Sequence, residues 1–198
     1  MGRDESGALV MPINRAMTTI FIAIVALSLT ACASTETKDS MHNHASQAAG
    51  DLSSDDVMFL QMMIPHHQQA IDISDLALTK SADSELLALA KNIRDEQSAE
   101  IVKMKAWLEE ANASSHSDSH SMGGMLSDAE LAALDKASGK SFDVLWLKAM
   151  TGHHTGAIDM AAMIENAKSA EIKSFGQGIV ASQSAQNKAM AAMIKRIG

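Results

Sequence analysis

The sequence is short of several residue types, and each shortage narrows what the chain can be. It has one cysteine, Cys32, so no disulfide can form within the chain. It has no tyrosine, four phenylalanines and two prolines, whereas alanine, methionine, leucine and isoleucine are abundant. Strands are rich in aromatic side chains, and alanine, methionine and leucine are strong helix formers. The composition therefore predicts an all-α fold.

Positive charge is also scarce, with 16 Lys and Arg against 24 Asp and Glu and a formal net charge of -8. Nucleic-acid-binding domains gather basic residues against phosphate, so we expect no nucleic-acid partner. The chain has no His-Glu-x-x-His motif of zinc peptidases, no Glu-x-x-His pair of di-iron proteins and no phosphate-binding loop. We therefore expect no enzymatic activity.

Near the N-terminus, the apolar run at 20–29 is too short to cross a bilayer. It follows Arg15 and ends just before Cys32, which predicts a signal peptide over 1–31. Small residues before a single cysteine resemble a bacterial lipobox, so we expect Cys32 to be lipidated. The lipid would anchor the protein in the periplasm, at the outer membrane. An ordinary signal peptide with a chance cysteine is the alternative. The polar residues 32–51 are expected to form a flexible tether.

The rest of the chain contains one segment twice. DVMFLQMMIPHHQQAID begins at Asp56 and DVLWLKAMTGHHTGAID begins at Asp143, and each has a methionine shortly before a His-His pair. Three further matches lie 86 positions apart: Ile93 with Ile179, Gln97 with Gln183 and Met104 with Met190. Self-similarity at a fixed period predicts two copies of one structural unit.

Each copy is predicted to be a helical hairpin, because its apolar residues recur at alternating spacings of three and four. We predict one domain over 52–198. Its parts are repeat one (54–112), a linker (113–126), a short helix (127–137) and repeat two (141–197). Both repeats interrupt the helix just before the histidines, with Pro65 in one and Gly152 in the other. These breaks either open space around the imidazoles or are tolerated without a role.

The histidine pairs and their methionines suggest a metal site, because residues three and four apart share one face of a helix. The candidates are Met63 with His66 and His67, and Met150 with His153 and His154. Thioether sulfur prefers Cu(I) and by extension Ag(I), and imidazole accepts Cu(I), Cu(II) or Zn(II). The mixture points to copper. The alternative is ordinary core packing, in which methionine is a common filler.

Three segments, MMIPHHQQAIDIS, IRDEQSAEIVKMKAWL and FDVLWLKAMTGHHTGAIDMA, resemble the bacterial family called domain of unknown function three hundred and five, which includes periplasmic copper-binding proteins. The resemblance implies a ferritin-like four-helix bundle and copper binding in the cell envelope. Its matching ligand candidates are Met62, Met63, His66, His67, Met104, Met150, His153, His154 and Met190. Ala149 stands where a methionine would parallel Met62, so we expect the second site to be poorer in sulfur.

Other polar residues are predicted to support these ligands. Gln97, Glu100 and Gln183 lie at core positions and are expected to fix the imidazoles by hydrogen bonds. If the first hairpin turns near Ser81, antiparallel counting places His66 and His67 opposite residues 95–97. The same counting places Met104 opposite Met58.

We therefore predict an envelope lipoprotein that binds copper ions, mainly Cu(I) and also Cu(II) and Ag(I). It would sequester the metal or transfer it to a partner protein, in copper homeostasis and resistance. Two other interpretations stay open: an interaction module that binds an envelope protein without metal, and a redox enzyme such as a cuprous oxidase.

Overall fold

The computed structural model describes residues 52–115 and 122–198. The predicted signal peptide, Cys32 and the tether fall within 1–51 and part of the linker within 116–121, so these predictions lie outside the described residues. The described residues form helices and connecting loops and contain no strand, which confirms the all-α prediction.

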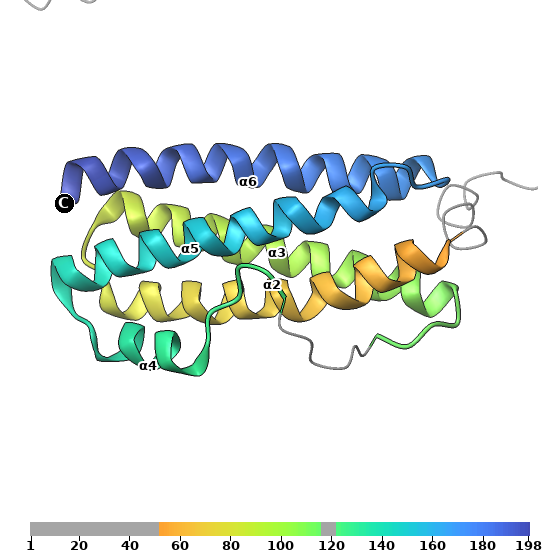
Figure 1. Ribbon diagram of the computed structural model, residues 1–198. Helices are drawn as coiled ribbons and strands as arrows, with labels where there is room; N and C mark the ends of the chain where they lie inside the picture. The colour runs from red at the N-terminus through yellow and green to blue at the C-terminus, as the bar shows by residue number, and fades with distance from the viewer. Residues whose placement is uncertain (1–51, 116–121) are drawn as a thin grey trace, which may run out of the picture. The chain divides into compact units, whose positions relative to one another are not determined.

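Four of the helices are long and one is short (Figure 1). They are α2 (Ser54–Lys80), α3 (Ser84–Glu110), α4 (Asp128–Lys136), α5 (Gly139–Ala161) and α6 (Ala170–Ile197), with a single 3-10 turn, η1 (Ala162–Ile164), after α5. Helix α2 packs along α3 and α5 packs along α6, and the two hairpins meet mainly through α2 and α5. None of the described helices is both long and apolar enough to span a membrane.

The helices begin where the sequence offers side chains that cap them. Ser53 Oγ accepts from the backbone N–H of Asp56, whose carboxylate accepts in return from the Ser53 N–H. Ser127 and Glu130 form the same reciprocal pair before α4. Each such cap satisfies backbone groups that the first helical turn leaves free and stabilises a helix by about 1 kcal/mol.

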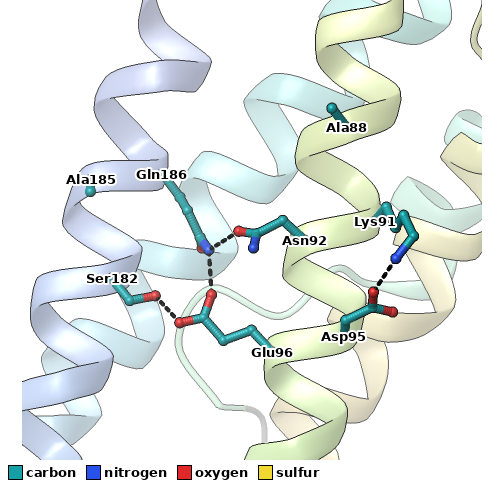
Figure 2. Close-up of a pocket in the computed structure, with 8 residues that line it drawn as sticks. All are labelled: Ala88, Lys91, Asn92, Asp95, Glu96, Ser182, Ala185 and Gln186. Carbon is teal, nitrogen blue, oxygen red and sulfur yellow. Dashed lines mark hydrogen bonds and ion pairs between the residues drawn. The ribbon is translucent and has the colours of Figure 1, made fainter. Parts of the chain in front are cut away.

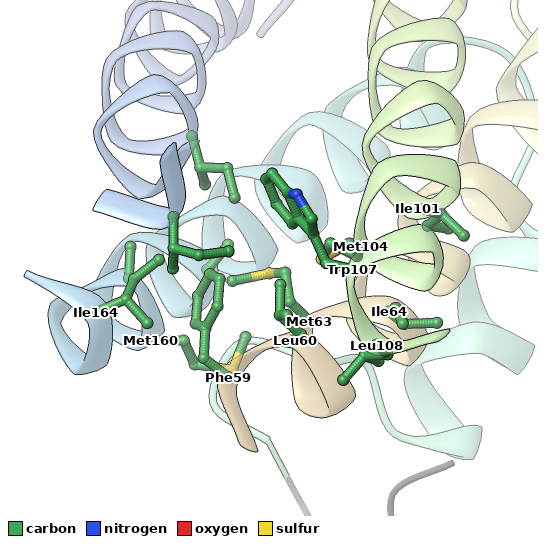
Figure 3. Packing of buried hydrophobic residues seen from close by; sticks show 14 of the residues in the cluster. Phe59, Leu60, Met63, Ile64, Ile101, Met104, Trp107, Leu108, Met160 and Ile164 are labelled. Atoms are coloured by element: carbon green, nitrogen blue, oxygen red, sulfur yellow. The ribbon is translucent and has the colours of Figure 1, made fainter. Parts of the chain in front are cut away.

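The core is divided into two apolar clusters. The first includes Phe59, Met63, Met104 and Trp107, which Figure 3 shows packed together. The second includes Phe142, Trp146, Met150 and Met190. The hairpins are also joined by a buried hydrogen bond, in which the Trp146 indole N–H donates to the Ile73 carbonyl at 2.8 Å.

A layer of polar side chains separates the two clusters. On the inner face of each long helix, two polar residues lie between the buried members of one cluster and those of the other. These eight residues, called the polar layer, are His66, His67, Gln97, Glu100, His153, His154, Gln183 and Gln186. All but Glu100 are buried. Because burying a polar group without a partner is costly, such a layer calls for an explanation beyond packing.

Candidate metal centre

The four histidines of the polar layer are fully buried, each with 0% of its surface exposed. Helix α2 supplies His66 and His67, and α5 supplies His153 and His154. The rings of His66 and His153 are in contact across the two hairpins, with centroids 3.8 Å apart. The two rings within each pair lie farther apart, at 6.5 Å on α2 and 6.4 Å on α5.

In the first repeat, both histidines use Nε2 to bind a protein oxygen. His66 Nε2 lies 3.2 Å from the carbonyl oxygen of Gly123, and His67 Nε2 lies 2.8 Å from Glu100 Oε2. A carbonyl oxygen and a carboxylate oxygen accept hydrogen bonds, so Nε2 of each ring is the donor and Nδ1 is the nitrogen left for a metal ion. Both Nδ1 atoms are buried and have no hydrogen-bond partner. The lone pair that a metal ion requires is thus free.

In the second repeat, His154 Nε2 lies 2.7 Å from Gln186 Oε1. Gln186 stands 86 positions after Glu100, so equivalent residues of the two repeats hold His67 and His154. The fourth histidine, His153, has no hydrogen-bond partner on either ring nitrogen. The second repeat therefore also presents ring nitrogens that no protein group engages.

Burial keeps three of the imidazoles, those of His66, His153 and His154, neutral. Desolvation, with a smaller contribution from the neighbouring His67 ring, lowers the pKa of His66 to about 3. Desolvation also lowers the pKa of His154 to about 4, and desolvation together with the His66 ring holds the pKa of His153 well below its usual range. A neutral imidazole can bind a metal without first losing a proton.

The predicted methionine ligands flank the polar layer on both sides. Met63 and Met104 belong to the first apolar cluster, Met150 and Met190 belong to the second, and all four are fully buried. Met62 is partly buried at the edge of the first cluster. One pair of buried methionines from each repeat, Met63 with Met104 and Met150 with Met190, thus lies on either side of the histidines.

Among residues 52–115 and 122–198, no three His, Cys, Asp or Glu side chains are grouped so that they could hold a metal ion. Histidine and carboxylate side chains alone therefore do not form such a cluster in this part of the chain. The methionines on either side of the polar layer add thioether sulfur, a soft donor that suits Cu(I) and by extension Ag(I).

The chain matches the family described as Domain of unknown function (DUF305) over residues 56–194. It belongs to this family. The membership confirms the resemblance inferred from the sequence. A search of curated protein sequences finds no match.

Several solved structures are similar to this chain. A DUF305 protein from Streptomyces coelicolor, described as a predicted secreted protein, is 30% identical, with a TM-score of 0.70 over 73% of this chain and 94% of its own. A DUF305 fragment from Deinococcus radiodurans is 27% identical, with a TM-score of 0.69 over 73% and 97%. CopM in its Cu(I)-bound form is 33% identical, with a TM-score of 0.62 over 71% and 96%. CopM has also been solved with Cu(II) and with silver.

In this DUF305 chain the segment 122–126, called the strap, runs alongside α2 and α5 (Figure 1), and its Gly123 carbonyl oxygen contacts His66 Nε2. The Gln69 amide clamps it through two hydrogen bonds to the backbone of Leu126, at 2.9 and 2.7 Å. The close approach requires glycine on both sides: a Cβ on Gly156 would overlap the Gly123 carbonyl, and one on Gly124, whose φ is 84°, would come within 2.7 Å of the Gly152 oxygen. This contact was not predicted from the sequence, although the Gly-Gly pair at 123–124 was a signal for it.

Antiparallel counting is wrong by about one helical turn. His67 meets Glu100 and not residues 95–97, and Met58 is 45% exposed whereas Met104 is fully buried. Side chains lean toward the N-terminus of their own helix, so on antiparallel helices His67 leans away from the connecting turn and Glu100 leans toward it. His67 therefore meets a residue whose Cα lies farther from the turn than its own.

The three predicted supporting residues have different surroundings. Glu100 Oε2 lies 2.8 Å from His67 Nε2, whereas Gln97 is buried with no hydrogen-bond partner on its side-chain nitrogen or oxygen. Gln183 is buried with Oε1 unpartnered. The sequence analysis missed Gln186 as a supporting residue, although its equivalence to Glu100 in the repeat would have found it.

Proposed function

We propose that this protein binds copper ions in the cell envelope and sequesters them or passes them to a partner protein in copper homeostasis. One observation carries the proposal: four buried imidazoles with unpartnered ring nitrogens lie between two pairs of buried methionines. As packing alone, this arrangement would leave several polar atoms buried without partners, at about 1–3 kcal/mol each. As a metal site, it has the donors that a soft ion needs.

The residues that would hold copper are the four histidines and the methionines beside them. In the first copy they are Met62, Met63, His66, His67 and Met104; in the second they are Met150, His153, His154 and Met190. Thioether and imidazole together suit Cu(I) best, and they also accept Ag(I) and Cu(II). Because Ala149 stands in the place of Met62, we propose that the second copy binds Cu(I) more weakly.

The solved relatives support the proposal. CopM, 33% identical over most of this chain, has been crystallised with Cu(I), and also with Cu(II) and silver. The Streptomyces coelicolor relative is described as a predicted secreted protein, which agrees with an envelope location. We further propose that the four long helices form a ferritin-like four-helix bundle and that lipidated Cys32 anchors it to the outer membrane.

We propose binding without turnover, and one titration separates this from the alternatives. The domain beginning after Cys32 is titrated anaerobically with Cu(I) against a chromogenic chelator, in the wild type and in His66→Ala/His67→Ala. The wild type should remove copper from the chelator, and the variant should take up less at unchanged helicity. A chelator that keeps all the copper would favour a metal-free interaction module, and equal uptake by the variant would overturn the ligand assignment. Repeated Cu(I) oxidation in air would indicate an oxidase.

A further inference from the structure

The side chain of Gln186 connects buried His154 with a polar groove on the outside of helices α3 and α6 (Figure 2). Gln186 itself is only 8% exposed. The polar residues that line the groove are Lys91, Asn92, Asp95, Glu96 and Ser182. Two of them, Asn92 and Glu96, bind the Gln186 amide, so the groove and the polar layer share one hydrogen-bond chain.

The orientation of the Gln186 amide is fixed by the chemistry of its partners. One end of the amide lies 2.7 Å from Glu96 Oε2 and 3.3 Å from Asn92 Oδ1. An ionised carboxylate only accepts, so this end must be the NH2 group. Ser182 Oγ donates to the other carboxylate oxygen of Glu96 at 2.5 Å and holds that side chain in place. The carbonyl oxygen of Gln186 is therefore the end that faces His154.

This orientation determines the tautomer of His154. The Gln186 oxygen can only accept, so His154 Nε2 must carry the proton and Nδ1 the lone pair. His154 Nδ1 is buried and has no hydrogen-bond partner. It therefore matches His66 and His67, whose Nδ1 atoms are also free. Three histidines of the layer thus present the same ring nitrogen.

We infer that Glu96, acting through Gln186, selects Nδ1 as the nitrogen with which His154 binds copper. Glu100 of α3 holds His67 directly, whereas Glu96 of the same helix reaches His154 only through the Gln186 amide of α6. Glu96 and Gln186 are thus positioning residues. The copper part of this inference rests on the proposed function, whereas the tautomer part depends on the hydrogen bonds alone.

Two matched variants test this role. Glu96→Gln keeps the size of the side chain but places a group there that can either donate or accept, so Gln186 becomes free to turn over. Asp95→Asn removes the same charge from the same groove, but Asp95 binds Lys91 and Arg94 and not Gln186. A purely electrostatic effect would appear in both variants, whereas a positioning effect would appear only in Glu96→Gln.

The first measurement is a long-range proton–nitrogen NMR correlation of the histidine rings in the metal-free protein, which shows directly which nitrogen carries the proton. We expect His154 in the Nε2–H form in the wild type and in Asp95→Asn, and a mixture of both forms in Glu96→Gln. The second measurement is Cu(I) affinity by chelator competition. Glu96→Gln should weaken the second-repeat site by about tenfold to a hundredfold, the usual effect of removing a group that orients a ligand.

Two results would overturn the inference: an Nδ1–H form of His154 in the wild type, or a tautomer in Glu96→Gln that is the same as in the wild type. Equal copper affinity of Glu96→Gln and the wild type, despite a changed tautomer, would overturn the claim that Nδ1 is the donor. If neither the wild type nor the variants bind copper while the tautomer still changes in Glu96→Gln, the proposed function fails and the positioning role of Glu96 stands.

Discussion

His66 and His153 are equivalent residues of the two repeats, 87 positions apart in the chain, and their rings touch with centroids 3.8 Å apart. The candidate sites of the repeats therefore adjoin each other at the middle of the molecule and do not stand at opposite ends. A metal ion held by one repeat would lie next to an imidazole of the other.

This contact predicts that the two histidines contribute to copper binding together. We expect the effects of His66→Ala and His153→Ala on Cu(I) affinity to be non-additive, with a coupling of about 0.5–3 kcal/mol, the range for residues in contact. The measurement is a double-mutant cycle by chelator competition, with helicity checked by circular dichroism. Effects that add to within about 0.5 kcal/mol would mean that the repeats bind metal independently.

Methionine sulfur, and not methionine volume, should matter for Cu(I). Replacing Met63 and Met104 with leucine keeps a similar size, so each change should cost less than about 1.5 kcal/mol of stability. We expect Cu(I) affinity to fall at least about tenfold, because leucine offers no soft donor. Met160→Leu is the matched control, since Met160 is buried in the same cluster but is not a predicted ligand. An equal loss in the control would assign the effect to packing.

The metal-free protein should lose stability as the pH falls below about 6.5. His66 and His154 have pKa values lowered to about 3 and about 4, and the pKa of His153 is lowered well below its usual range, whereas an unfolded histidine titrates near 6.5. Below that pH the unfolded chain binds protons that the folded chain does not, so acid favours unfolding. Each imidazole should remove about 1.4 kcal/mol per pH unit from the free energy of unfolding.

Urea denaturation in the presence of a metal chelator tests this at about pH 7.5 and about pH 5, above the range where most carboxyl groups titrate. The full stabilisation is present above the unfolded pKa and is lost as the pH decreases toward the folded values. His153→Leu removes one of the three histidines whose pKa is lowered. The free energy of unfolding of this variant should therefore change less between the two pH values than that of the wild type. Equal midpoints at both pH values in the wild type would contradict the assignment of neutral, buried imidazoles.

The strap provides a test based on two glycines of α5. Gly156→Ala places a Cβ against the Gly123 carbonyl, so the strap must move and His66 loses its acceptor. We expect a loss of about 1–3 kcal/mol in the free energy of unfolding, typical of overpacking. Gly152→Ala has nothing within 4 Å of the new Cβ, and it should stabilise the helix by about 0.5–1 kcal/mol. Opposite shifts in melting temperature are the expected result; a stabilised Gly156→Ala would show that the strap does not dock there.

The helices could be predicted from the sequence because their signals are local. The spacing of apolar residues and capping pairs such as Ser127 with Glu130 need no knowledge of the rest of the fold. The repeat then identified two equivalent hairpins. The side-chain pairs could not be predicted in the same way: the contact of His67 with Glu100 depends on how side chains lean on antiparallel helices, and simple counting missed it by a turn.

The contacts between the two hairpins could not be predicted from the sequence for a different reason. His66 meets His153, and Gln186 meets Glu96, only after α5 packs on α2 and α6 on α3. No local pattern encodes these pairings. The repeat did contain one unused clue, because Gln186 occupies the position of Glu100 and so indicated a second residue that holds a histidine.

The most direct test of the account is a crystal structure of the copper-loaded protein, with anomalous scattering recorded on both sides of the copper absorption edge. We expect a copper peak in the polar layer, within bonding distance of a histidine Nδ1 and a methionine sulfur. Copper bound through Nε2 of His66, His67 or His154 would contradict the tautomer assignment. Copper found only on the molecular surface, with the layer empty and its hydrogen bonds unchanged, would contradict the central claim that these buried histidines and methionines are a copper site.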